Sequence, residues 1–150
     1  MNTLLLTLPG PDPIADPGWD LCLDAHGNIA LAPNVRYAEA QDVASAVRTF
    51  RGEAWYDTTL GVPYFQQILG QLPSLQFMKA QFVAAAMTVP NIASVACFLT
   101  GPGPDRAVGG QLQIVDVDGY PVPVVSSPQL GVAPWYVSAV STDDPYDDNA

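Results

Sequence analysis

The chain has 150 residues, enough for one domain with a buried core but hardly enough for two. Its formal net charge is -10, yet only 13% of its residues are charged and 49% are apolar, whereas ordinary soluble domains carry about 25% charged residues. Such a chain must either hide much of its surface or shield it with partners, and its five basic residues are too few and too scattered for nucleic-acid binding.

The N-terminal residues predict an extended arm. The start, MNTLLLTLPG, lacks a basic stretch before its apolar run, which breaks at Pro9, so a signal peptide is not expected. No apolar stretch approaches the roughly 18 residues of a membrane span. Residues 9–18, PGPDPIADPG, hold four prolines and two glycines, which disfavour helix and central strand alike. Residues 1–18 are therefore expected to be extended.

Residues 19–31, WDLCLDAHGNIAL, predict a short β-hairpin. Trp19, Leu21 and Leu23 occupy every second position of the first arm, which is the period of a strand. The sequence HGN then supplies a turn into the second arm. His26, the only histidine, is expected at the solvated tip, where a lone histidine is weak evidence for catalysis.

Helical periodicity begins at about Tyr37. One helical face carries the apolar residues of the segment, which are Ala40, Val43, Ala44, Val47 and Phe50. Gly52 is placed to end this helix in the left-handed conformation. Arg48 and Arg51 then lie at the helix C-terminus, where cations favour the helix dipole.

A second long helix is expected from a Ser74 cap to Val89, after one possible helical turn at residues 64–69. Its first apolar face consists of Leu75, Met78, Phe82, Ala85, Ala86 and Val89. A second apolar face includes Phe77, Ala84 and Met87. A helix that is apolar on two sides is expected to pack on its own sheet with one side and on a partner with the other.

The C-terminal half predicts strands. A buried strand in NIASVACFL is followed by a polar loop and by a hairpin, QLQIVDV to YPVPVV, with a two-residue turn at Asp118-Gly119. Pro121 and Pro123 predict an edge strand or pairing on one side only. Asp116 and Asp118 are expected on one solvated side of the strand end.

These elements predict an α+β fold in which two main helices pack on a small mixed or antiparallel sheet. The predicted domain spans residues 19–126, between the arm at 1–18 and a flexible acidic C-terminal tail at 127–150. Cys22 and Cys97 are isolated, and the sequence leaves open whether they are two buried thiols or a disulfide.

The segment RTFRGEAWYDTTLGVPYF, residues 48–65, raises the functional question, because it gathers charged and aromatic side chains around two glycines. It could be an active site, a salt-bridged corner or a docking surface. Arg, Trp and Tyr are the residues most enriched at interface hot spots. We therefore predict a protein interface that involves Arg48, Arg51, Glu53, Trp55, Tyr56, Tyr64, Phe65 and, on the second helix, Phe77.

An active site has less support. Glu53 and Asp57 could be a pair of catalytic carboxyls, but neighbouring arginines would lower a carboxyl pKa, whereas a general acid needs a raised one. The sequence contains no histidine pair, no phosphate-binding glycine loop and no nucleophile motif. We expect no catalytic residue, no cofactor and no metal site.

The stretch DVASAVRTFRGEAWYDTTLGVPY resembles the signature of the small baseplate wedge proteins, or sheath initiators, of contractile-tailed bacteriophages. Members of this family, some of them labelled lysozyme-like, show an apolar helix, an R-T-x-x-G-E turn, aromatic or apolar residues and a later glycine. Arg48, Thr49, Gly52 and Glu53 match the turn, and Gly61 matches the later glycine. The resemblance covers roughly residues 20–118, and nothing in these residues supports hydrolysis.

This resemblance implies a structural protein of the virion, assembled in the bacterial cytoplasm and present in multiple copies around the tail. Its implied partners are other baseplate wedge proteins and the tail sheath protein, with tail tube or hub proteins as further candidates. It also implies strand sharing, for which residues 110–125 and the TLLLTL arm are the candidates. The alternatives are an adaptor of a related contractile injection or secretion system and a glycan hydrolase that uses Glu53.

Overall fold

A computed structural model describes residues 3–7, 18, 20–71, 73–102, 104, 108–126 and 135–137 of the chain. For residues 122–126 and 135–137 only the backbone is described here. All statements below concern these residues. Residues 8–17 of the predicted N-terminal arm and residues 127–134 and 138–150 of the predicted C-terminal tail lie outside them.

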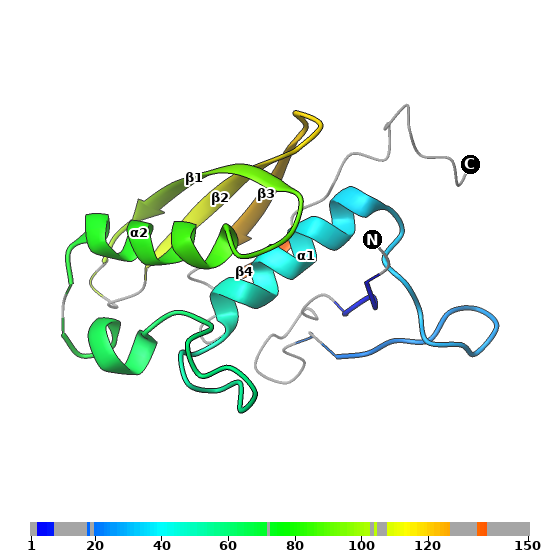
Figure 1. Ribbon diagram of the computed structural model, residues 1–150, viewed down its shortest axis with the longest axis horizontal. Helices are drawn as coiled ribbons and strands as arrows, with labels where there is room; N and C mark the ends of the chain where they lie inside the picture. The colour runs from blue at the N-terminus through cyan, green and yellow to red at the C-terminus, as the bar shows by residue number, and fades with distance from the viewer. Residues whose placement is uncertain are drawn as a thin grey trace.

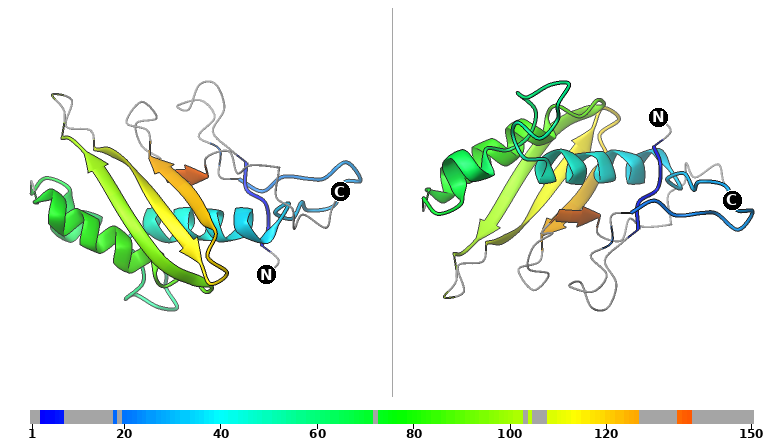
Figure 2. Two further views of the ribbon diagram at one scale, coloured as in Figure 1. Left: turned by 90° about the horizontal axis from the view of Figure 1, so that it is seen from above. Right: turned by 90° about the horizontal axis from the view of Figure 1, so that it is seen from below.

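The fold is α+β, as predicted, with two helices on one face of an antiparallel sheet (Figures 1 and 2). In chain order the elements are α1 (Val35–Arg48), the short helical turn η1 (Tyr64–Ile68), α2 (Leu75–Ala86), β1 (Ile92–Thr100), β2 (Gly109–Asp116), β3 (Pro121–Ser126) and β4 (Trp135–Val137). The sheet order is β1-β2-β3-β4, and each neighbouring pair is antiparallel. The core lies between this sheet and the two helices.

Helix α1 begins at an Asn34 cap, whose side-chain oxygen accepts a 2.8 Å hydrogen bond from the N–H of Tyr37. Its predicted apolar face is confirmed for Ala40, Val43, Ala44 and Val47, which are fully buried, but not for Phe50, which lies beyond the helix and is exposed. The predicted end at Gly52 is wrong. The helix ends at Arg48 because the N–H and hydroxyl of Thr49 both bond the Ser45 carbonyl, and the chain turns away as extended backbone.

Helix α2 begins at the predicted cap, where the Ser74 hydroxyl accepts a 3.2 Å hydrogen bond from the N–H of Phe77. Its first predicted apolar face is confirmed as the core face, with Met78, Phe82, Ala85 and Ala86 buried and Leu75 packed against them. The predicted end at Val89 is wrong, because the helix ends at Ala86, and Val89 is buried beyond that end. The second face differs, because Ala84 and Met87 are exposed and Phe77 is half-buried. The described part of the chain therefore leaves this second face open.

The β2–β3 hairpin corrects two predictions. The N–H of Asp116 bonds the Tyr120 carbonyl at 3.1 Å, so the turn contains three residues, Val117–Gly119, and not two. Gly119 takes the positive φ of 89° that such a turn requires. Asp116 is buried rather than solvated, because its carboxylate accepts hydrogen bonds from the N–H groups of Asp118 and Tyr120.

Strand β3 is not an edge along its whole length. Its residues Val124–Ser126 pair with β4, three residues of the predicted tail, while Pro121 and Pro123 pair with β2 alone among the described residues. The prediction that residues 110–125 form an intermolecular sheet is wrong for β2, which has a strand of its own chain on both sides. The outer strands of the described sheet are β1 and β4.

The predicted hairpin near residues 19–31 is confirmed. Leu23 pairs with Ile29, and Asp24 Oδ1 accepts the N–H groups of His26 and Asn28, which closes the turn and holds His26 at the exposed tip. Figure 1 shows this hairpin projecting from the body of the domain. We call residues 20–32 the N-terminal hairpin.

The described part of the TLLLTL segment is bound to its own chain and not, as predicted, available as an arm for a neighbour. The Gln41 side chain of α1 holds it by donating to the Leu4 carbonyl at 2.7 Å and accepting the Leu6 N–H at 2.9 Å. Leu5 also donates to the Ala30 carbonyl of the N-terminal hairpin at 2.9 Å. No helix among the described residues is long and apolar enough to span a membrane.

Candidate functional site

Residues 49–65, which we call the aromatic loop, leave the C-terminus of α1 and return to the core through η1. A parallel bridge between Phe50 and Val62 closes the loop. The Arg51 N–H donates to the Val62 carbonyl, and the Val62 N–H donates to the Thr49 carbonyl, both at 2.9 Å. Val62 is fully buried. The base of the loop is thus tied to the core by main-chain bonds and by a buried side chain.

Gly61 makes this closure possible. Its φ is +92°, and a Cβ atom at this position would lie 2.5 Å from the Thr49 carbonyl oxygen and 2.9 Å from the Phe50 carbonyl carbon. Real Cβ atoms do not approach backbone this closely, and residues with a Cβ disfavour this φ. A glycine is therefore required where the two arms of the loop cross.

The two acidic residues of the loop are engaged in separate turns. The Glu53 carboxylate accepts the Phe50 N–H at 2.9 Å, and the Glu53 N–H donates to the Phe50 carbonyl at 3.0 Å. Asp57 accepts the hydroxyl and the N–H of Thr59, and these hydrogen bonds lower the pKa of Asp57. Both side chains stabilise turns, and neither is directed by these contacts toward a shared reaction centre.

The predicted interface aromatics separate into two groups. Tyr64 faces the core, where its hydroxyl donates to the Val47 carbonyl and its ring lies 5.3 Å from Phe50 and 6.1 Å from Phe82 between ring centroids. Phe65 stacks edge-on with Phe50 at 4.9 Å but is exposed. Tyr64 therefore anchors the loop, while Phe65 belongs to its open surface.

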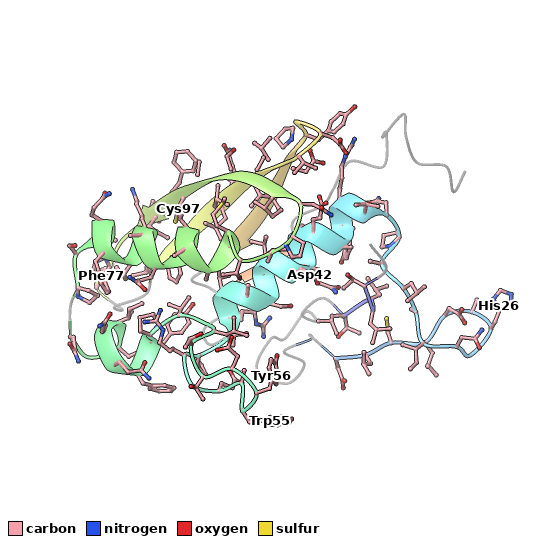
Figure 3. The ribbon with its side chains drawn as sticks, in the orientation of Figure 1. His26, Asp42, Trp55, Tyr56, Phe77 and Cys97 are labelled. Atoms are coloured by element: carbon pink, nitrogen blue, oxygen red, sulfur yellow. The ribbon has the colours of Figure 1, made fainter. Side chains whose placement is uncertain are left out.

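Trp55 and Tyr56 are the most exposed aromatics of the loop. Their side chains are 89% and 72% exposed, and their rings meet edge to face at 5.8 Å between centroids. Figure 3 shows both residues at the outer bend of the loop, directed away from the core. Two large apolar rings are thus presented to solvent on a closed loop, the arrangement of interface hot-spot residues.

The arginines of the segment occupy different environments. Arg48, in the last turn of α1, is half-buried, and burial lowers its pKa. Arg51 is exposed, and its carbonyl accepts a 3.3 Å hydrogen bond from the Gln66 side chain. Phe77 lies at the start of α2, apart from Trp55 and Tyr56 (Figure 3). Of the predicted interface residues, the structure therefore exposes Arg51, Glu53, Trp55, Tyr56 and Phe65 on the aromatic loop, places Arg48 and Tyr64 nearer the core, and leaves Phe77 on a separate surface.

Sequence reasoning missed a second open apolar surface, on the N-terminal hairpin. Leu21, Leu23, Ile29 and Leu31 are each more than half exposed. The alternation of Trp19, Leu21 and Leu23 predicted the strand correctly, but it does not by itself say whether the apolar side faces the core or solvent. Here the other side is the more covered one, since Ala30 is buried and Cys22 is half-buried.

It also missed a buried carboxyl in α1. Glu39 is 2% exposed, and no hydrogen-bond partner to its Oε2 is found among the described residues. Burial and then the nearby carboxylate of Asp116 raise the pKa of Glu39, opposed by a hydrogen bond from Asn91. Nothing in the sequence around Glu39, which directly precedes Ala40, indicates that its carboxyl is buried.

Two other predicted features can be placed. Cys22 and Cys97 are free thiols and do not form a disulfide. In the part of the chain that the structure describes, no three His, Cys, Asp or Glu residues come together as possible metal ligands.

Comparison with known proteins adds no relative: no protein-family model matches the chain, and no curated protein matches it significantly.

Proposed function

We propose that this chain is a structural protein of a contractile phage tail baseplate, which joins wedge proteins around the tube and starts assembly of the sheath. The observation that carries this proposal is the aromatic loop, a closed loop that exposes Trp55 and Tyr56 almost completely. Residues with this exposure on a main-chain-bonded loop are costly to leave in water and are typical of protein contacts.

The structure of the loop gives physical roles to residues that match the baseplate family signature. Gly61 is required by the crossing of Thr49 and Phe50, and Glu53 closes the turn after α1 by accepting the Phe50 N–H. In these roles Gly61 and Glu53 fix the backbone shape of the aromatic loop. They support an assembly protein over a glycan hydrolase, because Glu53 is exposed and bonded to backbone, whereas the general acid of a glycan hydrolase is held in a substrate cleft.

Strand sharing with the sheath belongs at β1 in this proposal. β1 has nine residues, Ile92–Thr100, and is an outer strand of the sheet, while β2 lies inside it. A β-bulge between Ile92 and Ser94 interrupts the register at one end, and the remaining pairs run regularly to Thr100. An incoming extended segment would add to β1 by main-chain hydrogen bonds.

The test is assembly of particles by the genome that encodes the chain. With Trp55→Ala we expect baseplates and sheathed tails, counted by negative-stain electron microscopy, to be lost, while the purified variant melts at the wild-type temperature. Val117→Ala is the matched control, because Val117 is also an apolar residue, 65% exposed, but lies in the β2–β3 turn. Normal tails from Trp55→Ala would contradict the proposal, as would glycan cleavage by the purified chain that Glu53→Gln abolishes.

A further inference from the structure

Strand β1 is an outer strand of the described sheet, and most of its length lacks the features that usually block an open edge. Its sequence, IASVACFLT, contains no charged residue and no proline. A bulge disturbs the end near Ile92, but pairing with β2 is regular from Ser94 to Thr100. Soluble proteins commonly protect such edges with charges, prolines or bulges, because the free N–H and C=O groups otherwise pair with another extended chain. The edge of β1 is therefore open to an added strand.

Helix α2 lies beside this edge. It packs on β1, and Figures 1 and 2 show it along the β1 side of the sheet. Val95 and Cys97 of β1 are on the side of the sheet that the helices cover, because they lie opposite Ile114 and Leu112, which are buried in the core. Val95 and Cys97 themselves are only half-buried. The cover that α2 gives to β1 is thus incomplete at the edge.

Lys79 lies on the flank of α2 that is next to these side chains. Leu75, Lys79 and Val83 follow one another at intervals of four residues, which places them in one row along the helix, and all three are half-buried. Burial raises the pKa of Cys97 to about 11, and the nearby Lys79 ammonium acts in the opposite direction. The row with Lys79 at its centre therefore borders the incompletely covered part of β1.

Lys79 is an isolated positive charge in a region without acidic residues. It is the only lysine of the chain, and the segment 58–104, which includes α2 and β1, contains no other charged residue. Among the described residues it has no ion-pair partner, although the chain carries 15 acidic residues. A half-buried ammonium gains from a carboxylate that covers it. The surface of α2 and the β1 edge therefore complements an acidic ligand, although the chain as a whole is acidic.

We propose that the β1 edge binds an extended segment of a partner protein that places an acidic side chain against Lys79. The main chain of this segment pairs with residues 94–100, and its alternate side chains lie next to Val95 and Cys97. Main-chain hydrogen bonds supply affinity, while the acidic residue determines which segment binds and in which register. The inference rests on the proposed function only for strand addition at β1, and it adds the residue that sets specificity.

A direct test is possible because Lys79 supplies the only side-chain amine of the chain. Cells that assemble the particle are lysed and treated with a water-soluble carbodiimide, which joins an amine to a carboxylate in contact with it. Mass spectrometry of the digest then identifies the joined peptides. We expect Lys79 to be joined to Asp or Glu of a partner, in a segment where apolar residues alternate. Lys79→Arg, which keeps the charge but has no amine, should give no such product.

Charge reversal then tests whether this pair controls binding. Lys79→Glu should bind the identified partner roughly tenfold or more weakly, and Lys79→Arg should bind it like wild type. Changing the joined acidic residue of the partner to lysine should restore binding to Lys79→Glu. Because Lys79 has no ion-pair partner among the described residues, the variants should keep the wild-type melting temperature. If Lys79→Glu does not fold, Lys79→Gln takes its place and should also bind more weakly.

The inference is overturned if Lys79 is joined to no partner, only to carboxyls of its own chain, or to a helical segment of a partner. Lys79→Glu binding the partner like wild type overturns it too. The proposed function fails separately. If Lys79 is joined to nothing while Trp55→Ala still blocks particle assembly, the baseplate role stands and the inference is wrong. If particles lack the chain but Lys79 is joined to an extended acidic segment, the inference stands and the baseplate role is wrong.

Discussion

At the scale of single residues, Gly61 and Gly52 share a backbone conformation but differ in their surroundings. Their φ angles are +92° and +90°, yet a Cβ on Gly61 would overlap the Thr49 carbonyl, while a Cβ on Gly52 would meet nothing within 4 Å. The first position combines conformational strain with a backbone clash. The second carries conformational strain alone.

We therefore expect Gly61→Ala to destabilise the fold more than Gly52→Ala. Left-handed backbone costs a residue with a Cβ about 1–2 kcal/mol, which is the expected loss for Gly52→Ala. The clash adds roughly 1–3 kcal/mol at Gly61. Urea denaturation measures both free energies of unfolding. Equal losses of stability in the two variants would show that the backbone around Thr49 and Phe50 moves away from the added Cβ at no cost.

Glu39 is the second residue whose environment makes a prediction. Because its pKa is raised above the ordinary 4.5 in the folded chain, the unfolded chain releases this proton first as the pH rises. Folding then loses stability from about pH 4.5 upward until the pH passes the raised pKa of Glu39. At pH values well below 4.5, Glu39 is protonated in both the folded and the unfolded chain, so it does not change the free energy of unfolding.

Glu39→Gln should remove this contribution. We expect the free energy of unfolding of the variant to fall less steeply than that of wild type as the pH rises above about 4.5. Urea titrations at a series of pH values measure the slope, with Asp20→Asn at an exposed position as the control. Identical slopes for wild type and Glu39→Gln would mean that the carboxyl ionises without cost.

At the scale of elements, we expect the core face of α2 to govern stability and its second face to govern assembly. Phe82 is 5% exposed and packs in the core next to Tyr64, whereas Phe77 is half-buried. Phe82→Ala should cost roughly 3–5 kcal/mol of stability, as removal of a buried phenylalanine ring does. Phe77→Asp should change the melting temperature far less but impair particle assembly. Normal assembly of Phe77→Asp would make this second face ordinary surface.

The elements that the sequence predicted well are those with local signals. The apolar spacing from Ala40 to Val47 and the Ser74 cap specify α1 and α2, because helical period and capping act within one or two turns. The predicted end of α1 was wrong because Thr49, three residues before Gly52, takes the C-cap position. Strand β4 was missed because three residues pair with β3 through a contact that no local pattern encodes.

The candidate site was predictable in part for the same reason. The aromatic loop was found from its composition, and Gly61 from its place in a signature. The sequence does not show which aromatic residues of the loop face the core. Tyr64 does so because it contacts Val47 and Phe82, which are distant in the sequence, whereas Trp55 faces solvent. The placement of the segment 3–7 beside the N-terminal hairpin likewise depends on distant residues, since Gln41 of α1 bonds the main chain of Leu4 and Leu6.

At the scale of the whole molecule, open apolar surfaces occur at both ends of α1 and on the second face of α2. A chain with 49% apolar residues and only 13% charged ones has little polar surface with which to surround them. The proposed function accounts for this composition, because contacts with other subunits would cover these surfaces. The central claim is therefore that the aromatic loop is buried against another subunit in a contractile tail baseplate.

A cryo-EM map of the particle made by the genome that encodes this chain tests the claim most directly. We expect density for the chain in several copies around the tube, with Trp55 and Tyr56 buried against a neighbouring subunit. A particle that lacks the chain, or one in which the aromatic loop faces solvent in every copy, would contradict it.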